Sequence, residues 1–247
     1  MKIKENKKRG FTLSEVLITL AIIGVVAALT LPTMIANHQK KVYVVQLQKA
    51  ISTLEQGFKM MMADDAVDNL DYTSVFQLCA NTLQPNGDPA GDCLLGAYDS
   101  DEATKQFFDA WKDYFNISEI NTIGKDITIY NLNGEADDSR IYNSNDYVIK
   151  FADGMWFDMG SGLLTYPSYS HKNEVNNKYY QIMGCFGIDV NGAKGPNTYG
   201  RDIFWLCLSS DGTIGGDYGD GTKGTCTSDS YASCVSYLMN NGWVMDY

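Results

Sequence analysis

The chain has 247 residues, of which 45% are hydrophobic and 12% aromatic, so it can bury a substantial core and is not a disordered chain. Its 30 Asp and Glu residues outnumber its 19 Lys and Arg residues, and this acidity argues against a general nucleic-acid-binding protein, which needs clustered basic residues. With only two histidines, His38 and His171, the chain is also poorly supplied for His-rich metal sites and for His-based catalysis.

Charge and hydropathy are both uneven along the chain. Residues 1–10 hold five basic residues and one acidic residue; without them the chain has 14 basic and 29 acidic residues and a net charge of −15. Residues 11–36 follow, with Glu15 as their only charge. As a helix this span would be about 39 Å long, enough to cross a hydrocarbon core of about 30 Å. The basic flank predicts a cytoplasmic N-terminus, with the rest of the chain outside.

The apolar run does not have the features of an ordinary secretory signal. It is longer than a signal core, and no small-residue cleavage site follows it. It also contains Glu15, although an ionised carboxylate costs roughly 2.5–3.5 kcal/mol at the centre of a membrane helix. One explanation is a capping box, in which Glu15 reaches back to Thr12 at the helix start. Another is cleavage after Gly10, which would place a new amino group on Phe11, one helical turn from Glu15.

The residues around Gly10 and Phe11 resemble a known processing motif. The sequence Lys8-Arg9-Gly10-Phe11-Thr12-Leu13-Ser14-Glu15 resembles the prepilin processing motif of type IV pilins and type II secretion pseudopilins. The resemblance covers residues 1–60. It implies that a prepilin peptidase of the inner membrane cuts between Gly10 and Phe11 and N-methylates Phe11. Glu15 and Pro32 then occupy the fifth and twenty-second mature positions, as in that family.

The same resemblance implies how the chain assembles and where it is found. Glu15 would pair with the Phe11 amine of a neighbouring subunit, because a buried charge without a partner is heavily penalised. Gly24 and Pro32 would weaken the helix locally during assembly. The expected partners are the prepilin peptidase, like subunits and other pilins or pseudopilins, and an inner-membrane assembly platform. The expected location is the bacterial inner membrane, single-pass with the head outside the cytoplasm, and then the pilus or pseudopilus.

An apolar stripe with spacings of three and four residues predicts that the helix continues through residues 37–63. Its members are Val44, Leu47, Ile51, Leu54, Phe58 and Met61. We expect this stripe to face a sheet. Residues 66–98 are predicted to be rich in loops and turns, and a second helix is predicted over residues 101–115. That helix would bury Ala103, Phe107, Ala110, Trp111 and Tyr114.

The period then changes to two, which predicts strands. The expected strands are residues 126–130, 147–151, 155–159, 179–190 and 203–209, with Asp-Gly turns at 153–154 and 211–212. The fold class is therefore α+β: a long N-terminal membrane-spanning helix whose outer half packs on a C-terminal antiparallel sheet, which is the pilin-like plan. We expect four segments, a cleaved leader (1–10), a transmembrane polymerisation half (11–36), an outer helical half (37–63) and an extracytoplasmic head (64–247).

Six cysteines follow the apolar span, and an even number in an outward-facing domain favours disulfides. Fifteen pairings are possible. We favour three local ones: Cys79–Cys93, Cys185–Cys207 and Cys226–Cys234. Cys185 and Cys207 are symmetric about the connection between two expected strands, so antiparallel pairing would bring them opposite each other. The alternative for each cysteine is a buried small apolar side chain, and the lack of a Cys-x-x-Cys sequence disfavours a zinc or thioredoxin-like site.

One loop has the composition of a cation site. Asp189 and Asn191, followed by Asp202, supply oxygen ligands with the spacing that opens hard-cation loops. The loop is not an EF-hand, because Ala193 and Gly200 occupy the fifth and twelfth positions. Similar Asp-rich loops near the C-terminal sheet bind calcium in some secretion pseudopilins. The alternative is a tight Asx and Gly turn without an ion. No other cofactor is predicted.

Catalysis has little support in the sequence. No Gly-x-Ser-x-Gly sequence and no phosphate-binding loop are present, so we predict that the chain is not an enzyme. The predicted function is that of a structural subunit of a type IV pilus or a type II secretion pseudopilus. The alternative is a membrane-anchored extracytoplasmic binding protein or adhesin. An anchored hydrolase has the least support.

Overall fold

The computed structural model describes residues 10–80, 102–122, 127–137, 147–158, 166–172, 179–216, 225–228 and 230–247. It divides the chain into two compact units, Met1–Val42 and Tyr43–Tyr247. The expected leader, apart from Gly10, lies outside the described residues, as does Cys93 and therefore the expected Cys79–Cys93 pairing.

The first helix, α1, runs without interruption from Leu13 to Asp64 and contains Pro32. Its N-terminal part includes an 18-residue window with a mean hydropathy of 2.4 that is not buried in the structure. By length and composition, α1 is the one helix in the described part of the chain that could cross a membrane. The hydroxyls of Thr19, Thr30 and Thr33 each donate to a carbonyl of the preceding turn, at 2.9 Å. These polar groups are therefore satisfied within the helix, as an apolar environment requires.

The outer half of α1 is amphipathic, and all six residues of the predicted stripe are buried. Phe58 is fully buried and lies edge-on to Trp111 and Phe115, with ring centroids 5.4 and 5.5 Å away. Gly57 permits this packing, because a Cβ atom at that position would collide with the Phe115 ring. The predicted stripe is thus confirmed as the side of α1 that forms the core of the second unit.

Two short helical segments and a third helix follow α1. They are the 3-10 helix η1 (Leu70–Tyr72), α2 (Ser74–Ala80) and α3 (Glu102–Trp111). The expectation of a turn-rich region over residues 66–98 was wrong for α2, which is too short to show a helical period. Its first turn is capped by Thr73, whose hydroxyl accepts from the Phe76 amide at 3.3 Å. The helix expected over 101–115 ends earlier, at Trp111, but it buries Phe107 and Trp111 completely, as predicted.

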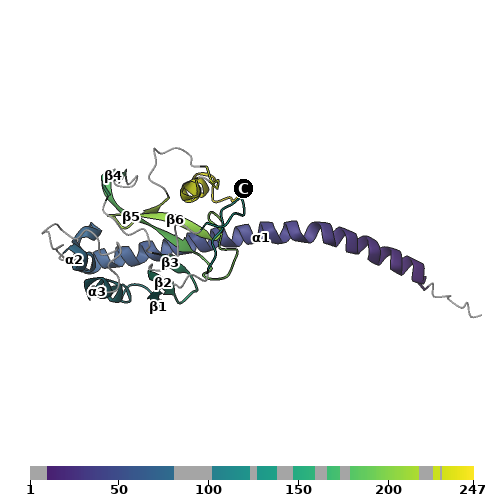
Figure 1. Cartoon of the computed structure of the whole chain (residues 1–247), viewed down its shortest axis with the longest axis horizontal. Coiled ribbons are helices and arrows are strands. Elements are labelled where there is room, and N and C mark those ends of the chain that lie inside the picture. The colour runs from purple at the N-terminus through teal and green to yellow at the C-terminus, as the bar shows by residue number, and fades with distance from the viewer. Residues whose placement is uncertain are drawn as a thin grey trace, which may run out of the picture. The chain divides into compact units, whose positions relative to one another are not determined.

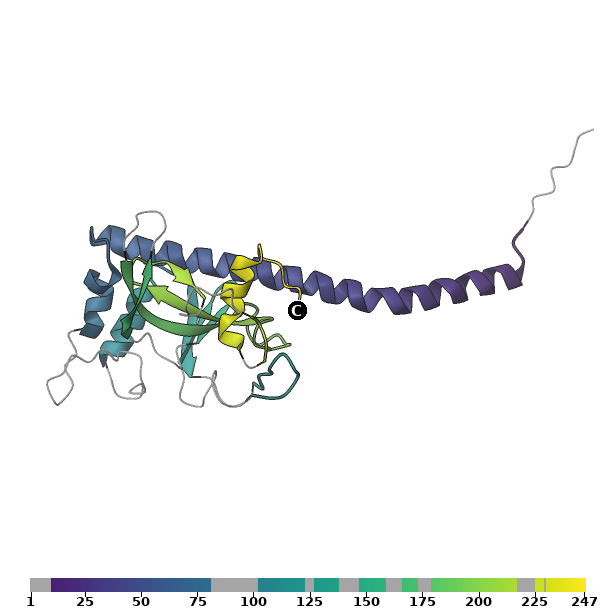
Figure 2. The ribbon, with the colours of Figure 1, turned by 90° about the horizontal axis from the view of Figure 1, so that it is seen from above.

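Seven strands of the described chain form one sheet in which every pairing is antiparallel. They are β1 (Ile117–Thr122), β2 (Tyr147–Phe151), β3 (Trp156–Asp158), β4 (Tyr166–Lys172), β5 (Tyr179–Asp189), β6 (Ile203–Ser209) and β7 (Ile214–Gly215). The order is β1-β2-β3-β5-β6-β7, and β4 pairs with the other end of β5. The outer half of α1 runs along one face of this sheet in both views (Figure 1, Figure 2). The predicted α+β class is confirmed.

The two faces of the sheet bury different side chains. Phe157, Phe186 and Leu206 belong to the large core that includes α1, whereas Val148 and Ile203 belong to a smaller cluster with Tyr199. Phe186 and Leu206 are opposite each other in the β5–β6 register. This alternation places the head core between α1 and the sheet.

The strand expected over residues 126–130 was wrong in its described part, where Tyr130 makes only isolated bridges to Ala136 and Thr198. The sequence analysis also missed β1, β4 and the short helix α4 (Cys234–Asn240), which follows the 3-10 helix η2 (Tyr231–Ser233). The sequences of β1 and β4 alternate weakly and carry polar residues or proline, so they lack the pattern of a half-buried strand.

Two disulfides lie in the described part of the second unit. Cys185 and Cys207 are directly opposite each other on β5 and β6 and are bonded, with Cα atoms 4.0 Å apart. Cys226 is bonded to Cys234 at the start of α4. Both are pairings that the sequence favoured, and the first follows from the antiparallel register of its two strands.

Candidate functional site

The start of α1 contains a capping box. The Glu15 carboxylate oxygen Oε2 accepts from the Thr12 amide at 2.8 Å and from the Thr12 hydroxyl at 2.9 Å. The Thr12 hydroxyl in turn accepts from the Glu15 amide at 3.3 Å. The capping box considered for Glu15 is therefore present in the single chain, where the carboxylate has polar partners at the start of its own helix. The expected pairing with the Phe11 amine of a neighbour concerns an assembly and stays a prediction.

The first unit exposes large apolar side chains on every side of α1. Phe11 is 88% exposed, and the same holds, to a lesser degree, for the following residues: Leu13, Val16, Leu17, Ile18, Leu20, Ile22, Ile23, Val25, Val26, Leu29, Leu31, Met34 and Ile35. A helix that is apolar all round requires apolar surroundings, whether lipid or other helices. Gly10 and Phe11 precede this helix and lie outside it, with Gly10 exposed.

Comparison with known proteins bears on this segment. A family model described as "Prokaryotic N-terminal methylation motif" matches residues 6–31, which contain Gly10, Phe11 and Glu15. The N-terminal segment carries a prokaryotic N-terminal methylation motif.

A curated relative matches a longer stretch of the chain. The type II secretion system core protein G of Escherichia coli (strain K12) is 38% identical over 63 residues, which cover 24% of this chain and 41% of that protein. The matched region is thus less than half of either chain. No solved structure matches the chain.

The predicted cation ligands come together in the loop between β5 and β6. Asp189 ends β5, Asp202 directly precedes β6, and both are buried, with 1% and 0% of their surface exposed. An Asp189 carboxylate oxygen accepts from the Asn191 amide at 3.1 Å. The Asp202 carboxylate accepts from the Thr198 and Asn197 amides at 2.7 and 2.9 Å. Burial raises the pKa of the Asp202 carboxyl, and these hydrogen bonds oppose the rise.

The side-chain oxygens of this loop suit a hard cation only in part. The side-chain oxygens Oδ1 of Asn191 and Asn197 are buried without a hydrogen-bond partner, which leaves two oxygens available as ligands. Both Asp202 oxygens, however, already accept hydrogen bonds from backbone amides. Within the described ranges, no group of three or more His, Cys, Asp or Glu side chains is arranged to hold a metal ion. The loop therefore has oxygen ligands for calcium but few charges to hold it.

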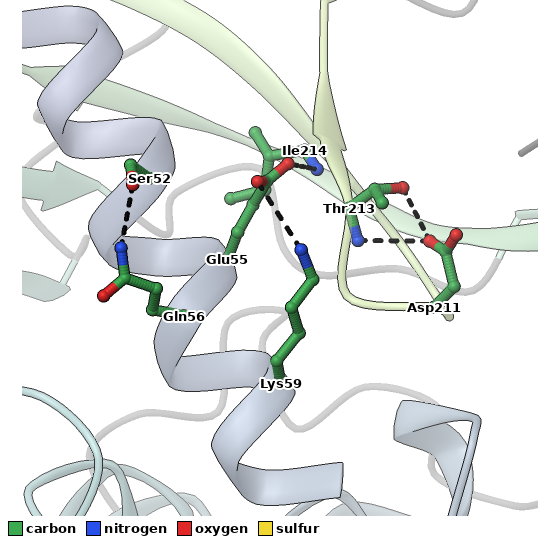
Figure 3. Close-up of polar contacts among 7 residues, drawn as sticks. All are labelled: Ser52, Glu55, Gln56, Lys59, Asp211, Thr213 and Ile214. Carbon is green, nitrogen blue, oxygen red and sulfur yellow. Dashed lines mark hydrogen bonds and ion pairs between the residues drawn. The ribbon is translucent and has the colours of Figure 1, made fainter. Parts of the chain in front are cut away.

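A polar contact between α1 and the β6–β7 turn was not anticipated. The Glu55 carboxylate accepts from the Ile214 amide at 3.0 Å and lies 3.9 Å from the Lys59 amine (Figure 3). In the turn itself, Asp211 accepts from the amide and the hydroxyl of Thr213 at 3.1 and 2.6 Å (Figure 3). Glu55 lies outside the predicted apolar stripe of α1. A partner 159 residues away leaves no local signal that could have revealed this contact.

Proposed function

We propose that the chain is a structural, non-enzymatic subunit of a type IV pilus or a type II secretion pseudopilus. The observation that carries this proposal is the methylation motif at residues 6–31, placed at the start of a helix that is apolar and exposed all round. The similarity to a type II secretion core protein over 63 residues supports it. An α+β head joined to that helix by a continuous α1 is the expected architecture.

In this proposal the membrane holds the chain before assembly. Residues 11–36 would span the bacterial inner membrane once, with the disulfide-bonded second unit outside the cytoplasm. A prepilin peptidase would cut between Gly10 and Phe11 and methylate the new amine. The exposure of Gly10 and its position outside α1 support access to this bond.

Assembly would exchange the partners of Glu15. In the single chain Thr12 satisfies the carboxylate, and in the fibre the Phe11 amine of a neighbouring subunit would do so. An ion pair removed from water is stabilising only when both charges are well paired, so the exchange favours one register between subunits. Pro32 would ease a local change of the helix, since it removes one helical hydrogen bond. Like subunits, other pilins or pseudopilins and an inner-membrane platform would be the partners.

We further propose that Asp189, Asn191 and Asp202 bind calcium in the β5–β6 loop. The buried Oδ1 of Asn191, which has no hydrogen-bond partner, supports this, and the Oδ1 of Asn197 in the same loop is in the same state. The test is thermal melting of the whole protein with calcium, with magnesium and with a chelator. We expect calcium to raise the melting temperature and Asp202→Asn to abolish that increase. An unchanged melting temperature at saturating calcium would remove the proposal.

The main test follows the chain through processing and assembly. Mass spectrometry of the mature protein should show loss of residues 1–10 and a methylated Phe11, both dependent on the peptidase. Glu15→Ala should leave processing intact and abolish incorporation into filaments sheared from cells. A mature protein that still begins at Met1, or normal filaments from Glu15→Ala, would contradict the proposal. Processed protein that stays in the membrane and never enters filaments would favour an anchored binding protein or adhesin instead.

A further inference from the structure

The turn that carries Asp202 is closed by its own backbone. Residues 197–202, here called the Asp202 turn, lie between β5 and β6, and the Thr198 carbonyl accepts from the amides of Asp202 and Ile203 at 3.3 and 3.2 Å. The Gly200 amide donates to the Ile203 carbonyl at 2.7 Å. Gly200 has a φ of 76°, which lies in the left-handed region that favours glycine. One residue separates Gly200 from Asp202, so a displacement of Gly200 also displaces the Asp202 carboxylate.

A disulfide lies directly against Gly200. A Cβ atom at Gly200 would be 2.8 Å from the sulfur atoms of both Cys226 and Cys234, which is closer than van der Waals contact allows. Cys234 is the first residue of α4, the yellow helix in Figure 1 and Figure 2. This helix contacts β6 and buries Val235 and Leu238 completely in the head core. The bonded cysteines are thus fixed to the core, and the Gly200 backbone packs on them.

Tyr247 holds the same glycine by a hydrogen bond. Its hydroxyl donates to the Gly200 carbonyl at 2.7 Å. Burial raises the pKa of the Tyr247 hydroxyl, which therefore keeps the proton that it donates. The Tyr247 ring lies edge-on to Tyr237 of α4, with centroids 5.7 Å apart, and the Tyr237 hydroxyl donates to Asp246 at 2.6 Å. Helix α4 therefore restrains Gly200 twice, through Cys234 and through Tyr247.

A different segment holds the beginning of the Asp202 turn. The Tyr130 amide donates to the Asn197 carbonyl at 2.9 Å, and the Tyr199 amide donates to the Tyr130 carbonyl at 3.0 Å. These two hydrogen bonds do not involve the C-terminal segment, so they should persist when the disulfide is opened. Loss of the disulfide should therefore loosen Gly200 and Asp202 without unfolding the whole loop.

We propose that the Cys226–Cys234 disulfide and Tyr247 position the Asp202 turn for cation binding, so that oxidation of this cysteine pair raises the cation affinity of the β5–β6 loop. The inference rests on the proposed calcium site. Groups that hold a metal ligand from behind commonly change metal affinity, although they do not touch the ion. A ligand that is already ordered binds more tightly, because the conformational entropy of ordering it has been lost before the ion arrives.

The covalent step is a thiol–disulfide exchange in which the oxidant is the disulfide of another protein. The two thiols of Cys226 and Cys234 give up two electrons and two protons and form one sulfur–sulfur bond. The oxidant takes up the electrons and protons, and its own disulfide becomes a dithiol. An added dithiol reverses the reaction, which returns the Asp202 turn to its looser form.

The first test measures calcium affinity by titration calorimetry of the full-length protein in detergent. Replacing Cys226 and Cys234 together with alanine should weaken calcium binding at least about tenfold. Tyr247→Phe keeps the ring but removes the hydrogen bond to Gly200, so it should weaken binding about threefold to fivefold. Tyr237→Phe is the matched control, because its hydroxyl bonds Asp246 and not Gly200, and it should leave the affinity unchanged.

The second test needs no calcium. The Asn197 and Thr198 amides, which donate to Asp202, should exchange hydrogen faster in the double cysteine variant, whereas the Tyr199 amide should keep its protection through Tyr130. If Tyr199 also loses protection, the variant has lost more than the turn, and Tyr247→Phe decides instead.

The outcomes separate this inference from the calcium proposal. Calcium binding with equal affinity in the native protein, the double cysteine variant and Tyr247→Phe overturns only the inference. Unchanged exchange of the Asn197 and Thr198 amides in both variants also overturns it, because the turn would then be ordered without these contacts. A native protein that binds no calcium contradicts the calcium proposal itself, and the inference falls with it.

Discussion

The two halves of α1 have the same secondary structure and opposite surroundings. Residues 13–42 expose their apolar side chains on all sides, whereas residues 43–64 gather most of theirs on one face and bury them in the head, with Val45 and Met60 as exposed exceptions. Polar side chains such as Gln48, Ser52 and Glu55 lie on the other face of the outer half, whereas residues 16–36 of the inner half have only three threonines as polar side chains. The arrangement of apolar residues around the helix, rather than their number, thus distinguishes a surface made for lipid or other helices from one made for a protein core.

The strongest way to test this difference is to remove one large apolar side chain from each half. Phe58→Ala should destabilise the head by about 3–5 kcal/mol, because Phe58 is fully buried among aromatic rings. Ile23→Ala, at a position that is 63% exposed, should leave the head unchanged. Urea unfolding of the detergent-solubilised protein measures both, and equal losses of stability would contradict the separation of the two units.

Reduction of the disulfides should affect only the second unit. Replacing Cys185 and Cys207 together with alanine should lower its free energy of unfolding by about 3 kcal/mol, since the bond closes a loop between strands. The Cys226–Cys234 disulfide closes a shorter loop, so replacing both of its cysteines with alanine should lower the free energy of unfolding by less. Unfolding with and without reductant measures the effect. The helical circular dichroism of residues 13–42 should persist, and its loss on reduction would argue against independent units.

Two glycines of α1 give a matched pair. Gly57→Ala should destabilise the head by about 1–3 kcal/mol, because the new Cβ atom collides with the Phe115 ring, although alanine is the better helix former. Gly24→Ala meets nothing within 4 Å and should be neutral or stabilise the helix by about 0.5–1 kcal/mol. Thermal melting of the two variants measures the contrast. A neutral Gly57→Ala would show that the α1 and Phe115 packing is not tight.

The smallest expected effect concerns the polar contact in Figure 3. Glu55→Ala removes the acceptor of the Ile214 amide and should cost about 1 kcal/mol. Glu55→Gln keeps an oxygen that can accept the same hydrogen bond and should cost less. Hydrogen exchange of the Ile214 amide reports the contact directly. Unchanged protection in Glu55→Ala would show that the contact does not anchor the β6–β7 turn.

The sequence predicted those parts of the fold whose signal is local and repeated. The α1 stripe, β2 and β6 match the expected residues because their periods are regular. Cys185 and Cys207 were expected to lie opposite each other because they are symmetric about the connection between two expected strands, and they do so on β5 and β6. By contrast, β1 is polar and α4 has seven residues, so neither presents a period long enough to detect.

The candidate sites were predictable to different degrees. The motif around Gly10 and Phe11 is contiguous and was recognised directly. The clustering of Asp189 and Asp202 was anticipated because they flank one strand connection, but the use of Asp202 by the Asn197 and Thr198 amides was not. The hydrogen bond between the Ile214 amide and Glu55 joins residues 159 positions apart. Such contacts depend on tertiary packing and have no trace in local sequence.

One consequence concerns the timing of folding in the cell. Gly200 lies against the sulfur atoms of Cys226 and Cys234, and Tyr247 holds the Gly200 carbonyl. Both contacts come from chain that follows all seven strands, so the ribosome delivers them after the sheet sequence is complete. The loop bearing Asp202 can therefore reach its final form only after residues 225–247 have been synthesised and Cys226 has been oxidised. A chain arrested before that step would carry an assembled sheet but an immature loop.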